Sequence, residues 1–435
     1  MPDRLQADGT TAVIGECIVS ARWLFSPGMP ILEGGALLLR NGRIAATGRL
    51  DHLRRDYNLP LFDYPGCAIV PGLINAHTHL ELTHFPAWRI HNHVDYHPHR
   101  FVDWIIQMVK VKRNLTAEDY AASFREGVRI CLESGTTAVG DIVSRPGALA
   151  GYSSDVLGGR MFFEVLGQDR GRLSQMLSQA VESARALEGS VFSAGLAPHA
   201  VYTIGDEHYD LILQAAREGA YPMALHLSES EAETEFVFES GGQLAEVFYP
   251  FVNWQNYLRP PRRCSPTELL HRHGMLTPGT LAIHCVHVSR ADVELLKKQG
   301  VTAVLCPRSN ERLNVGVAPV ALMKKLGITM VLGTDSLASN DSLSLWDEMR
   351  FALQSYNGHL NPLELLEMAT VGGATALGLD DGRGALTVGQ RADFQLIGGF
   401  GEVKSSELLP EKVLLHGDVV DVYVAGQRYR QAVDR

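Results

Sequence analysis

The chain has 435 residues, of which 46% are hydrophobic and 20% are charged, and its formal net charge is −10. This length accommodates one large domain and a small one, and the composition is ordinary for a packed globular protein. The acidic balance argues against a nucleic-acid polymer as partner, because surfaces that bind phosphate backbones are basic. No apolar run approaches the roughly 20 residues that cross a bilayer, and the N-terminal residues lack the apolar segment of a secretory signal. We therefore expect a cytoplasmic protein that binds small molecules and not membranes; its oligomeric state, a homodimer included, stays open.

The six cysteines form no CxxC pair. Several lie in apolar runs that read as strands, which is typical of buried free thiols in a reducing compartment. The ligand spacing of a structural zinc cluster is absent. The residues concerned are Cys17, Cys67, Cys131, Cys264, Cys285 and Cys306.

Both ends of the chain read as short strands separated by glycine turns. Residues 11–48 contain the runs CIVSARWLF and GGALLLRNG, and residues 383–431 contain ADFQLIGG and VVDVYVAGQ. Two β-rich ends that flank a larger domain can pair with each other, which would bring the termini together. The prediction is a small β-sandwich domain formed by residues 1–67 and 383–435.

Between the ends, short apolar runs that finish in Gly, Pro, His or Asp alternate with longer helix-like stretches. This alternation predicts parallel strands with helical crossovers. Thr116–Ser134 carries apolar residues at helical spacing, and Arg290–Gln299 and Pro319–Leu326 read as shorter helices. Eight such units predict an α/β fold with a (β/α)8 TIM-like barrel over residues 68–382. The eight predicted strands are Ala68–His79, Thr136–Val143, Met161–Gly167, Val191–His199, Tyr221–Glu229, Thr280–Val286, Val301–Pro307 and Ile328–Ser336.

The sharpest chemical signal is the pair His77 and His79 at the end of the first predicted strand, in PGLINAHTH. In a strand, residues i and i+2 point to the same face, so both imidazoles can reach one ion. Alone, such a pair is more often two surface histidines than a metal site. Three further polar residues come at or near the ends of other predicted strands, namely His226, His284 and Asp335. Because the C-terminal ends of all barrel strands meet at one mouth, these five side chains are expected to converge on one divalent cation, Zn²⁺, Fe²⁺ or Mn²⁺.

Glu229 follows His226 by three residues, in HLSESEAETE. At that point the chain turns into the loop, so the carboxyl group can lean over the mouth and carry protons. The alternative is a solvated loop carboxylate. Three more glutamates follow closely and are predicted to form a solvated helix face; they are Glu231, Glu233 and Glu235.

The segments PGLINAHTH, HLSE, HCVH and GTDS, in this order, resemble the amidohydrolase superfamily and, within it, the branch of cytosine, guanine and adenosine-derivative deaminases. The stretch GALTVGQRADF resembles the usual C-terminal return of that superfamily. The resemblance implies a single metal ion in a hydrolase that removes ammonia from a ring amidine. It implies that the ligands are His77, His79, His226 and Asp335, and that Glu229 and His284 are acid–base and oxyanion-orienting groups, with Asp335 also catalytic.

The sequence departs from the binuclear members of the superfamily, which carry a carboxylated lysine at the third or fourth strand. No lysine ends the predicted strands Met161–Gly167 or Val191–His199, which supports one ion. Glu164 lies within the third strand and leaves an alternative open, in which it bridges a second ion. A packed or substrate-facing Glu164 is the other interpretation.

In the mechanism that follows, a metal lowers the pKa of water so that hydroxide exists near neutral pH. Asp335 accepts the first proton, and His284 holds the hydroxide by a hydrogen bond. Glu229 protonates the ring nitrogen beside the attacked carbon, and ammonia then leaves. The His-x-x-Glu pattern favours such a deamination over the cleavage of a peptide-like amide.

The segment HTHLELTHF, together with MFFEVLG, CPRSNERLNVG and GTDSLASND, resembles most the aminodeoxyfutalosine deaminases of the alternative menaquinone pathway, and next the methylthioadenosine/S-adenosylhomocysteine deaminases. The first family acts on an adenine nucleoside with a benzoate tail. By this resemblance His199 contacts the substrate, while Glu81 is a candidate for binding sugar hydroxyls. Arginines near strand ends are candidates to pair with the tail carboxylate, although each alone is more often a surface arginine; they are Arg145, Arg308 and Arg312.

Several alternatives stay open at this stage. Residues 84–99, rich in histidine, follow the first metal strand and form either a lid or a polar surface. A methylthioadenosine, S-adenosylhomocysteine or guanine deaminase, or a chlorohydrolase acting on triazines, would use nearly the same metal chemistry. A catalytically dead scaffold would have lost metal ligands, and here every expected position is filled.

Overall fold

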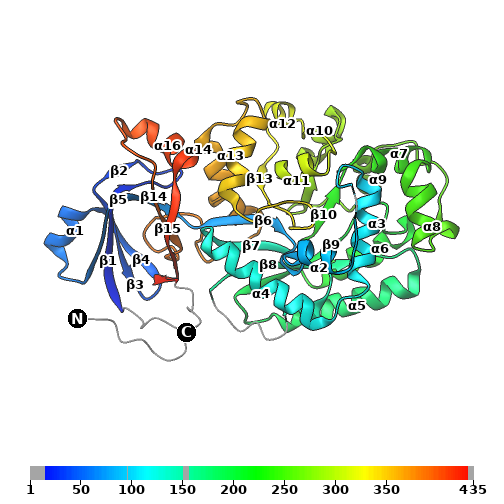
Figure 1. The fold of residues 1–435 in the computed structure, drawn as a ribbon, viewed down its shortest axis with the longest axis horizontal. Helices are drawn as coiled ribbons and strands as arrows, with labels where there is room; N and C mark the ends of the chain where they lie inside the picture. The colour runs from blue at the N-terminus through cyan, green and yellow to red at the C-terminus, as the bar shows by residue number, and fades with distance from the viewer. Residues whose placement is uncertain (1–14, 96, 150–155, 430–435) are drawn as a thin grey trace.

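A computed structural model describes residues 15–95, 97–149 and 156–429 of the chain. The molecule has a smaller β-rich part, built from both ends of the chain, beside a larger α/β part (Figure 1). In the larger part eight short parallel strands lie inside a layer of helices. No helix of the described residues is both long and apolar enough to cross a membrane.

The larger part contains two four-stranded parallel sheets. Single bridges join the sheets at both seams, Leu196 to Met223 on one side and Thr78 to Asp335 on the other. This arrangement is of the TIM-barrel type, and each of the eight predicted strands has a counterpart. The first sheet contains β6 (Leu73–Thr78), β7 (Thr136–Val143), β8 (Gly158–Val165) and β9 (Phe192–Pro198), and the second contains β10 (Ala224–Leu227), β11 (Leu281–His284), β12 (Thr302–Leu305) and β13 (Met330–Leu332).

Helices connect these strands, and the three that the sequence predicts are present. The clearest is α4, which begins at a capping box between Thr116 and Asp119 and packs its apolar face inward. The helices are α1 (Leu50–Asp56), α2 (Phe85–His91), α3 (Phe101–Lys112), α4 (Ala117–Glu133), α5 (Arg170–Ala186), α6 (Tyr209–Glu218), α7 (Glu231–Glu239), α8 (Tyr249–Phe251), α9 (Pro266–Arg272), α10 (Arg290–Lys298), α11 (Pro307–Arg312), α12 (Val320–Leu326), α13 (Leu345–Ser355), α14 (Pro362–Met368), α15 (Val371–Ala376) and α16 (Leu409–His416), with a π-turn at η4 (Leu244–Phe248).

The first predicted strand, Ala68–His79, is divided between two sheets. Its first residues belong to β5 (Leu61–Pro71), which pairs with a strand from the far end of the chain, whereas β6 pairs with β7. The chain crosses over at Gly72, where a Cβ atom would lie 2.4 Å from the Thr137 hydroxyl oxygen. Both halves are fully buried apolar runs, so hydrophobic periodicity carries no mark of the change.

The two ends of the chain meet in one eight-stranded sheet. The pairing of β5 with β14 joins N-terminal to C-terminal strands, as predicted. The strands form one continuous sheet, and a second, stacked sheet is not seen among the described residues, so the sandwich is not reproduced in that form. Residues 1–14 and 430–435 of the predicted domain lie outside the described residues. The strands are β1 (Glu16–Leu24), β2 (Leu32–Glu33), β3 (Gly35–Arg40), β4 (Arg43–Arg49), β5, β14 (Phe394–Gly398), β15 (Asp418–Val424) and β16 (Gln427–Arg428).

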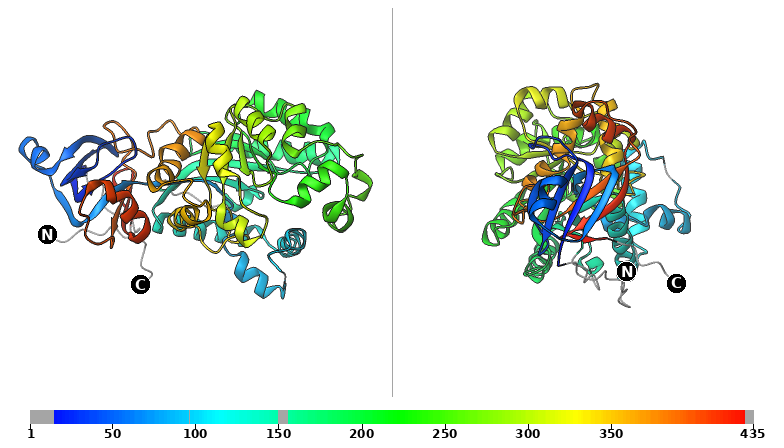
Figure 2. Two further views of the ribbon diagram at one scale, coloured as in Figure 1. Left: turned by 90° about the horizontal axis from the view of Figure 1, so that it is seen from above. Right: turned by 90° about the vertical axis from the view of Figure 1, so that its left-hand side faces the viewer.

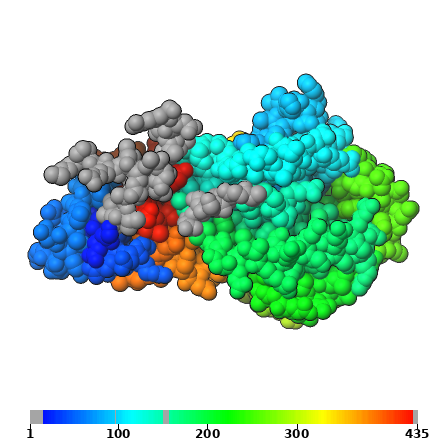
Figure 3. Space-filling model, turned by 90° about the horizontal axis from the view of Figure 1, so that it is seen from below, coloured from blue at the N-terminus to red at the C-terminus, as the bar shows by residue number. Residues whose placement is uncertain are grey.

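All six cysteines are free and buried, which confirms the expectation of unpaired thiols. The segment that carries α2 projects from the body of the molecule (Figures 2 and 3).

Gln395 of β14 joins the end sheet to the α/β part. It is fully buried, accepts a hydrogen bond from Trp346 Nε1 at 3.0 Å and donates one to the Pro71 carbonyl at 2.9 Å. Replacing Gln395 with Leu leaves two buried groups unpaired, at about 1–3 kcal/mol each, so the free energy of unfolding should fall by about 2–6 kcal/mol. Chemical denaturation measures this. The exposed Gln427→Leu in the same sheet is the control, and equal stability of the two variants would contradict the prediction.

Candidate functional site

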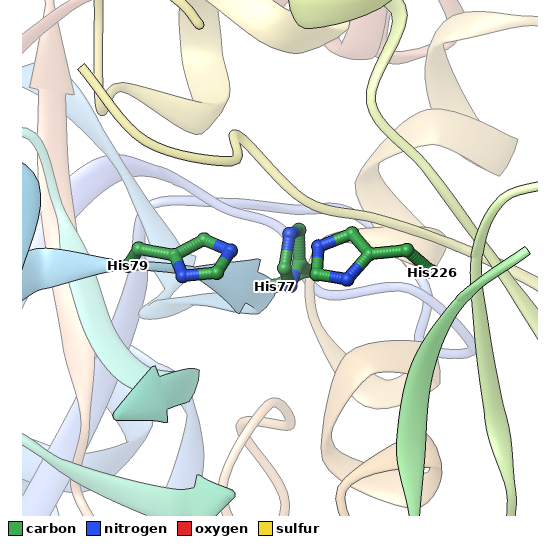
Figure 4. A group of neighbouring side chains, drawn as sticks. All are labelled: His77, His79 and His226. Atoms are coloured by element: carbon green, nitrogen blue, oxygen red, sulfur yellow. The ribbon is translucent and has the colours of Figure 1, made fainter. Parts of the chain in front are cut away.

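Three histidines from two strands face one point at the mouth of the α/β part. His77 and His79 come from the end of β6, and His226 comes from β10. The ring centroids lie 4.9 Å apart for His77 and His79 and 5.2 Å apart for His77 and His226, with the rings turned toward one another (Figure 4). One ligand atom from each of the three lies within 4.8 Å of the others, so the three can hold one metal ion.

Asp335 and His284 complete this cluster from β13 and β11. Asp335 Oδ1 lies 3.4 Å from His77 Nε2 and 3.7 Å from His79 Nε2. Asp335, His284 and His77 also form a second group with metal-ligand spacing. His284 and Asp335 have φ values of 73° and 60°, a left-handed backbone that costs energy for non-glycine residues and is concentrated at functional sites. The convergence expected from the sequence is therefore present.

The donor atoms of the cluster fit a divalent cation. His77 Nε2 and His284 Nε2 are buried and have no hydrogen-bond partner among the described residues. His226 Nδ1 donates to the His199 carbonyl at 3.1 Å, which leaves its Nε2 for an ion. Buried polar atoms without partners are costly, and a cation held by imidazole nitrogens and one carboxylate removes that cost.

Surrounding residues hold Asp335 and His284 in place. Asp335 Oδ2 accepts hydrogen bonds from Ser309 Oγ at 2.8 Å and Ser339 Oγ at 2.6 Å. His284 Nδ1 donates to Asn310 Oδ1 at 2.9 Å, which directs its Nε2 to the site. Sequence reasoning missed these three supporting residues. It singled out CPRSNERLNVG but attached importance to its arginines.

The two carboxyl groups of the site have opposite electrostatic environments. Burial, followed by repulsion from Asp335 and Glu233, raises the pKa of Glu229 well above its usual value. For Asp335, burial opposes ionisation, but His77, His79 and His284 outweigh it and hold the pKa well below its usual value. Two carboxyl groups with separated pKa values mark the proton donor and the proton acceptor of a site.

Glu229 is positioned by a second buried glutamate. Glu233 Oε2 accepts a hydrogen bond from the Glu229 backbone N–H at 2.9 Å, and Glu233 Oε1 accepts one from the Ser228 N–H at 3.0 Å. Glu233 is fully buried, so the prediction of a solvated helix face was wrong for this residue. Glu231 and Glu235 are exposed, as predicted. The difference arises because the chain folds back at Ser228 and brings Glu233 beneath the loop.

A cavity of about 360 Å³ opens beside the cluster. Its wall includes Glu229 and His284 next to the predicted metal ligands, and His199 beyond them. The wall combines apolar and aromatic residues with charged ones. The residues that sequence reasoning missed in this wall are Leu82, Trp104, Ile105, Met108, Val109, Lys112, Arg113, Ser144, Leu166, Met176, Tyr202, Thr203, Phe248, Val252, Trp254 and Ser336.

Of the five substrate-binding candidates, His199 and Arg145 lie in the cavity wall, and Glu81, Arg308 and Arg312 do not. Glu81 is fully buried, and its carboxylate accepts hydrogen bonds from the Ser144 hydroxyl and from the backbone N–H groups of Ser144 and Arg145. Arg308 pairs with Asp341 instead of facing the cavity. Both corrections have the same cause, because a residue near a strand end can point into the loop layer as well as into the mouth.

Three interpretations that the sequence left open concern Glu164, Arg312 and residues 84–99. Glu164 lines the cavity and belongs to neither group with metal-ligand spacing, so the second-ion interpretation finds no support among the described residues. Arg312 lies near Asp341, 4.0 Å away, and outside the cavity wall. The described residues of segment 84–99 do not line the cavity either, which favours a polar surface over a lid.

The chain was compared with curated proteins and solved structures. It is 31% identical over 375 residues to a 5-methylthioadenosine/S-adenosylhomocysteine deaminase of Desulforudis audaxviator, covering 83% of this chain and 80% of the relative. It is 29% identical over 353 residues to an aminodeoxyfutalosine deaminase of Deinococcus radiodurans, covering 79% and 81%. Its fold is similar to that of Helicobacter pylori aminofutalosine deaminase, with a TM-score of 0.82 at 24% identity over 95% of this chain and 100% of that one.

Residues 68–428 match the amidohydrolase family. The match spans the strands that carry the histidine cluster, Glu229 and Asp335. The chain belongs to the amidohydrolase family of hydrolases.

Proposed function

We propose that this protein is a metal-dependent hydrolytic deaminase of an adenosine derivative. The observation that carries the proposal is that two buried carboxyl groups stand beside one cluster of histidines, with the pKa of Glu229 raised by burial and that of Asp335 lowered by the neighbouring imidazoles. Glu229 Oε1 lies 3.5 Å from His284 Nε2, so acid, base and orienting imidazole share one small volume. Deamination of a ring amidine requires this combination, because protons must reach the ring nitrogen and then the leaving amine.

One divalent cation, Zn²⁺ or Fe²⁺, would be held by His77, His79, His226 and Asp335. When bound, such an ion lowers the pKa of water so that hydroxide is available near neutral pH. The donor set is three imidazoles and one carboxylate, which suits these borderline metals.

The chain's own residues then move the protons. Asp335 accepts a proton from the attacking water, and His284 Nε2 orients that water toward the ring carbon that bears the amino group. Glu229 gives its proton to the adjacent ring nitrogen, which makes the carbon electrophilic. As the carbon–oxygen bond forms, Asp335 passes the proton that it took from water to the amino group. The carbon–nitrogen bond breaks, ammonia leaves with its electron pair, and the new hydroxyl returns a proton to Glu229 as the ring carbonyl forms. Burial lowers the pKa of His284 to about 4, so its imidazole is neutral and can accept a hydrogen bond.

Within this class we propose aminodeoxyfutalosine as the substrate, which would place the reaction in menaquinone biosynthesis by the futalosine route. The cavity wall includes aromatic residues, among them Trp104, Phe248 and Trp254, which suit a benzoate ring. Arg145 and Arg113 are exposed and line the same cavity, so they can pair with the benzoate carboxylate. Methylthioadenosine and S-adenosylhomocysteine are the second candidates, because the relatives named for them are similar to this chain to the same degree.

Ammonia release tests this proposal on a panel of aminodeoxyfutalosine, adenosine, methylthioadenosine, S-adenosylhomocysteine, guanine and an aminated triazine. Aminodeoxyfutalosine should give the highest kcat/KM. A higher value for methylthioadenosine or S-adenosylhomocysteine would exclude a substrate with a benzoate tail but keep the assignment as a deaminase. Activity on guanine or the triazine alone would also exclude a nucleoside as the substrate.

The purified protein is expected to contain about one equivalent of divalent metal per chain, as four protein ligands define one site. His77→Ala should lose this ion in the same preparation, while the exposed His52→Ala should retain it. Elemental analysis measures both. Two tightly held ions per chain would contradict the single site.

Replacing Glu229 with Gln removes the transferable proton but keeps the shape of the side chain. We expect kcat to fall by about 10²–10⁴-fold, which is typical for the loss of a general acid–base group, with the metal content unchanged. The exposed Glu231→Gln, two residues away, should match the wild type. Near-native turnover of the Glu229 variant would remove Glu229 from the mechanism.

Arg145→Met is expected to raise KM for aminodeoxyfutalosine by roughly 10-fold or more, since hydrogen bonds to charged groups contribute about 1.5–3 kcal/mol. KM for methylthioadenosine, which has no carboxylate, should change little. Arg308→Met provides the control, because Arg308 pairs with Asp341 outside the cavity wall. Equal effects of Arg145→Met on both substrates would contradict a carboxylate-pairing role.

A further inference from the structure

A half-buried lysine lies in the wall of the cavity at the C-terminal end of α3. Lys112 Nζ donates to Ser144 Oγ at 2.9 Å and lies 3.9 Å from Glu81 Oε1. The Lys112 side chain retains 21% of its exposure, whereas the Glu81 side chain has none. An ammonium group has three N–H donors. The two protein partners therefore leave at least one donor for a molecule in the cavity.

Glu164 of β8 faces the same cavity and supplies the opposite charge. No described residue donates a hydrogen bond to its carboxylate, and no described cation lies within 4.0 Å of it. Burial alone would lower the pKa of Lys112, but the fields of Glu164 and then Glu81 outweigh burial and raise it. Lys112 and Glu164 thus attract each other across the cavity without forming a direct ion pair.

Lys112 and Glu164 line the same cavity as the histidine cluster. The ring of His199 stands 4.9 Å from the ring of His226, a predicted metal ligand. His199 lines the same cavity as Glu164 and Lys112, and its pKa, lowered mainly by burial, is raised by the charge of Glu164 and lowered by that of Lys112. A group bound between Lys112 and Glu164 would belong to the part of the substrate next to the reacting ring.

The local charges decide which group fits. Two cations, Lys112 and Arg145, are balanced by two carboxylates, Glu81 and Glu164. An anionic group at this place would meet the unpaired carboxylate of Glu164, and a cationic group would meet the ammonium of Lys112. A hydroxyl both accepts and donates hydrogen bonds, so neighbouring hydroxyls satisfy both side chains without a net charge.

We propose that Lys112 and Glu164 form a hydroxyl-recognition subsite, in which Lys112 donates to one hydroxyl of a ribosyl group and Glu164 accepts from its neighbour. The inference rests on the proposed function, since it assigns the sugar of the same substrate. The subsite takes over the role that the sequence predicted for Glu81. Glu81 lies outside the cavity wall and instead holds Lys112 and the Ser144 loop in position.

The test compares kcat/KM for adenosine, 2′-deoxyadenosine, 3′-deoxyadenosine and 2′,3′-dideoxyadenosine. For the wild type, each missing hydroxyl should lower kcat/KM by roughly 10- to 100-fold, because these hydrogen bonds involve charged groups. In Glu164→Met and in Lys112→Met the penalty for at least one hydroxyl should shrink to within about threefold. The exposed Glu182→Met and Lys110→Met are matched controls and should keep the wild-type penalties.

Lys112→Met leaves Glu81 buried without its cation and can impair folding. Glu164→Met is therefore the variant that decides whether the subsite exists. Its metal content and melting temperature are measured in the same preparation. If Glu164→Met lowers kcat/KM equally for all four nucleosides, the subsite is wrong while the proposed function stands. The subsite is also wrong if the wild type does not discriminate among them. If the wild type releases ammonia from none of these nucleosides, and not from aminodeoxyfutalosine, methylthioadenosine or S-adenosylhomocysteine, the proposed function itself falls, and the subsite with it.

Discussion

The structure is organised around imidazole nitrogens that are buried at strand ends without a protein partner. His77 Nε2 and His284 Nε2 are in this position, with the Asp335 carboxylate a few ångströms away. A packed interior does not tolerate such atoms unless something satisfies them. One divalent cation would do so, and it would also stabilise the end of β6 against the end of β13, where the two sheets meet through a single bridge. The proposed reaction and the contact between the two sheets would therefore depend on the same few atoms.

Residues that hydrogen-bond to this cluster hold its side chains in one arrangement. The short helix α11 presents Ser309 to Asp335 and Asn310 to His284, so one turn of chain orients a carboxylate and an imidazole together. Glu233 does the same for Glu229 through its backbone N–H. Rigid positioning of this kind matters because proton transfer requires groups held within hydrogen-bond reach of the reacting atoms. The left-handed backbone at His284 and Asp335 is the conformational cost of this arrangement.

The charged side chains of the cavity differ in how deeply they are buried. Asp335 and Glu229 are buried at the cluster, Lys112 and Glu164 are half-buried in the cavity wall, and Arg145 is exposed there. This order fits a substrate with a neutral aminated ring, a hydroxylated middle and an anionic end. Because the chain carries a net charge of −10, arginines in the cavity wall are a local feature and not a consequence of overall composition.

Local sequence pattern determines three features of this protein. They are the order of strands and helices, the free buried cysteines, and the convergence of His77, His79, His226, His284 and Asp335. They follow from apolar runs that end in polar residues and from the common edge of parallel strands.

Three features were decided only by tertiary structure. Gly72 divides one apolar run between two sheets, Glu81 and Glu233 turn inward to hold backbone, and Lys112 enters the cavity from a helix with no motif to mark it. The physical reason is that hydrophobic period and residue spacing report which face a side chain takes on its own element. Whether that face meets a cavity, a loop or another sheet depends on contacts far apart in the chain.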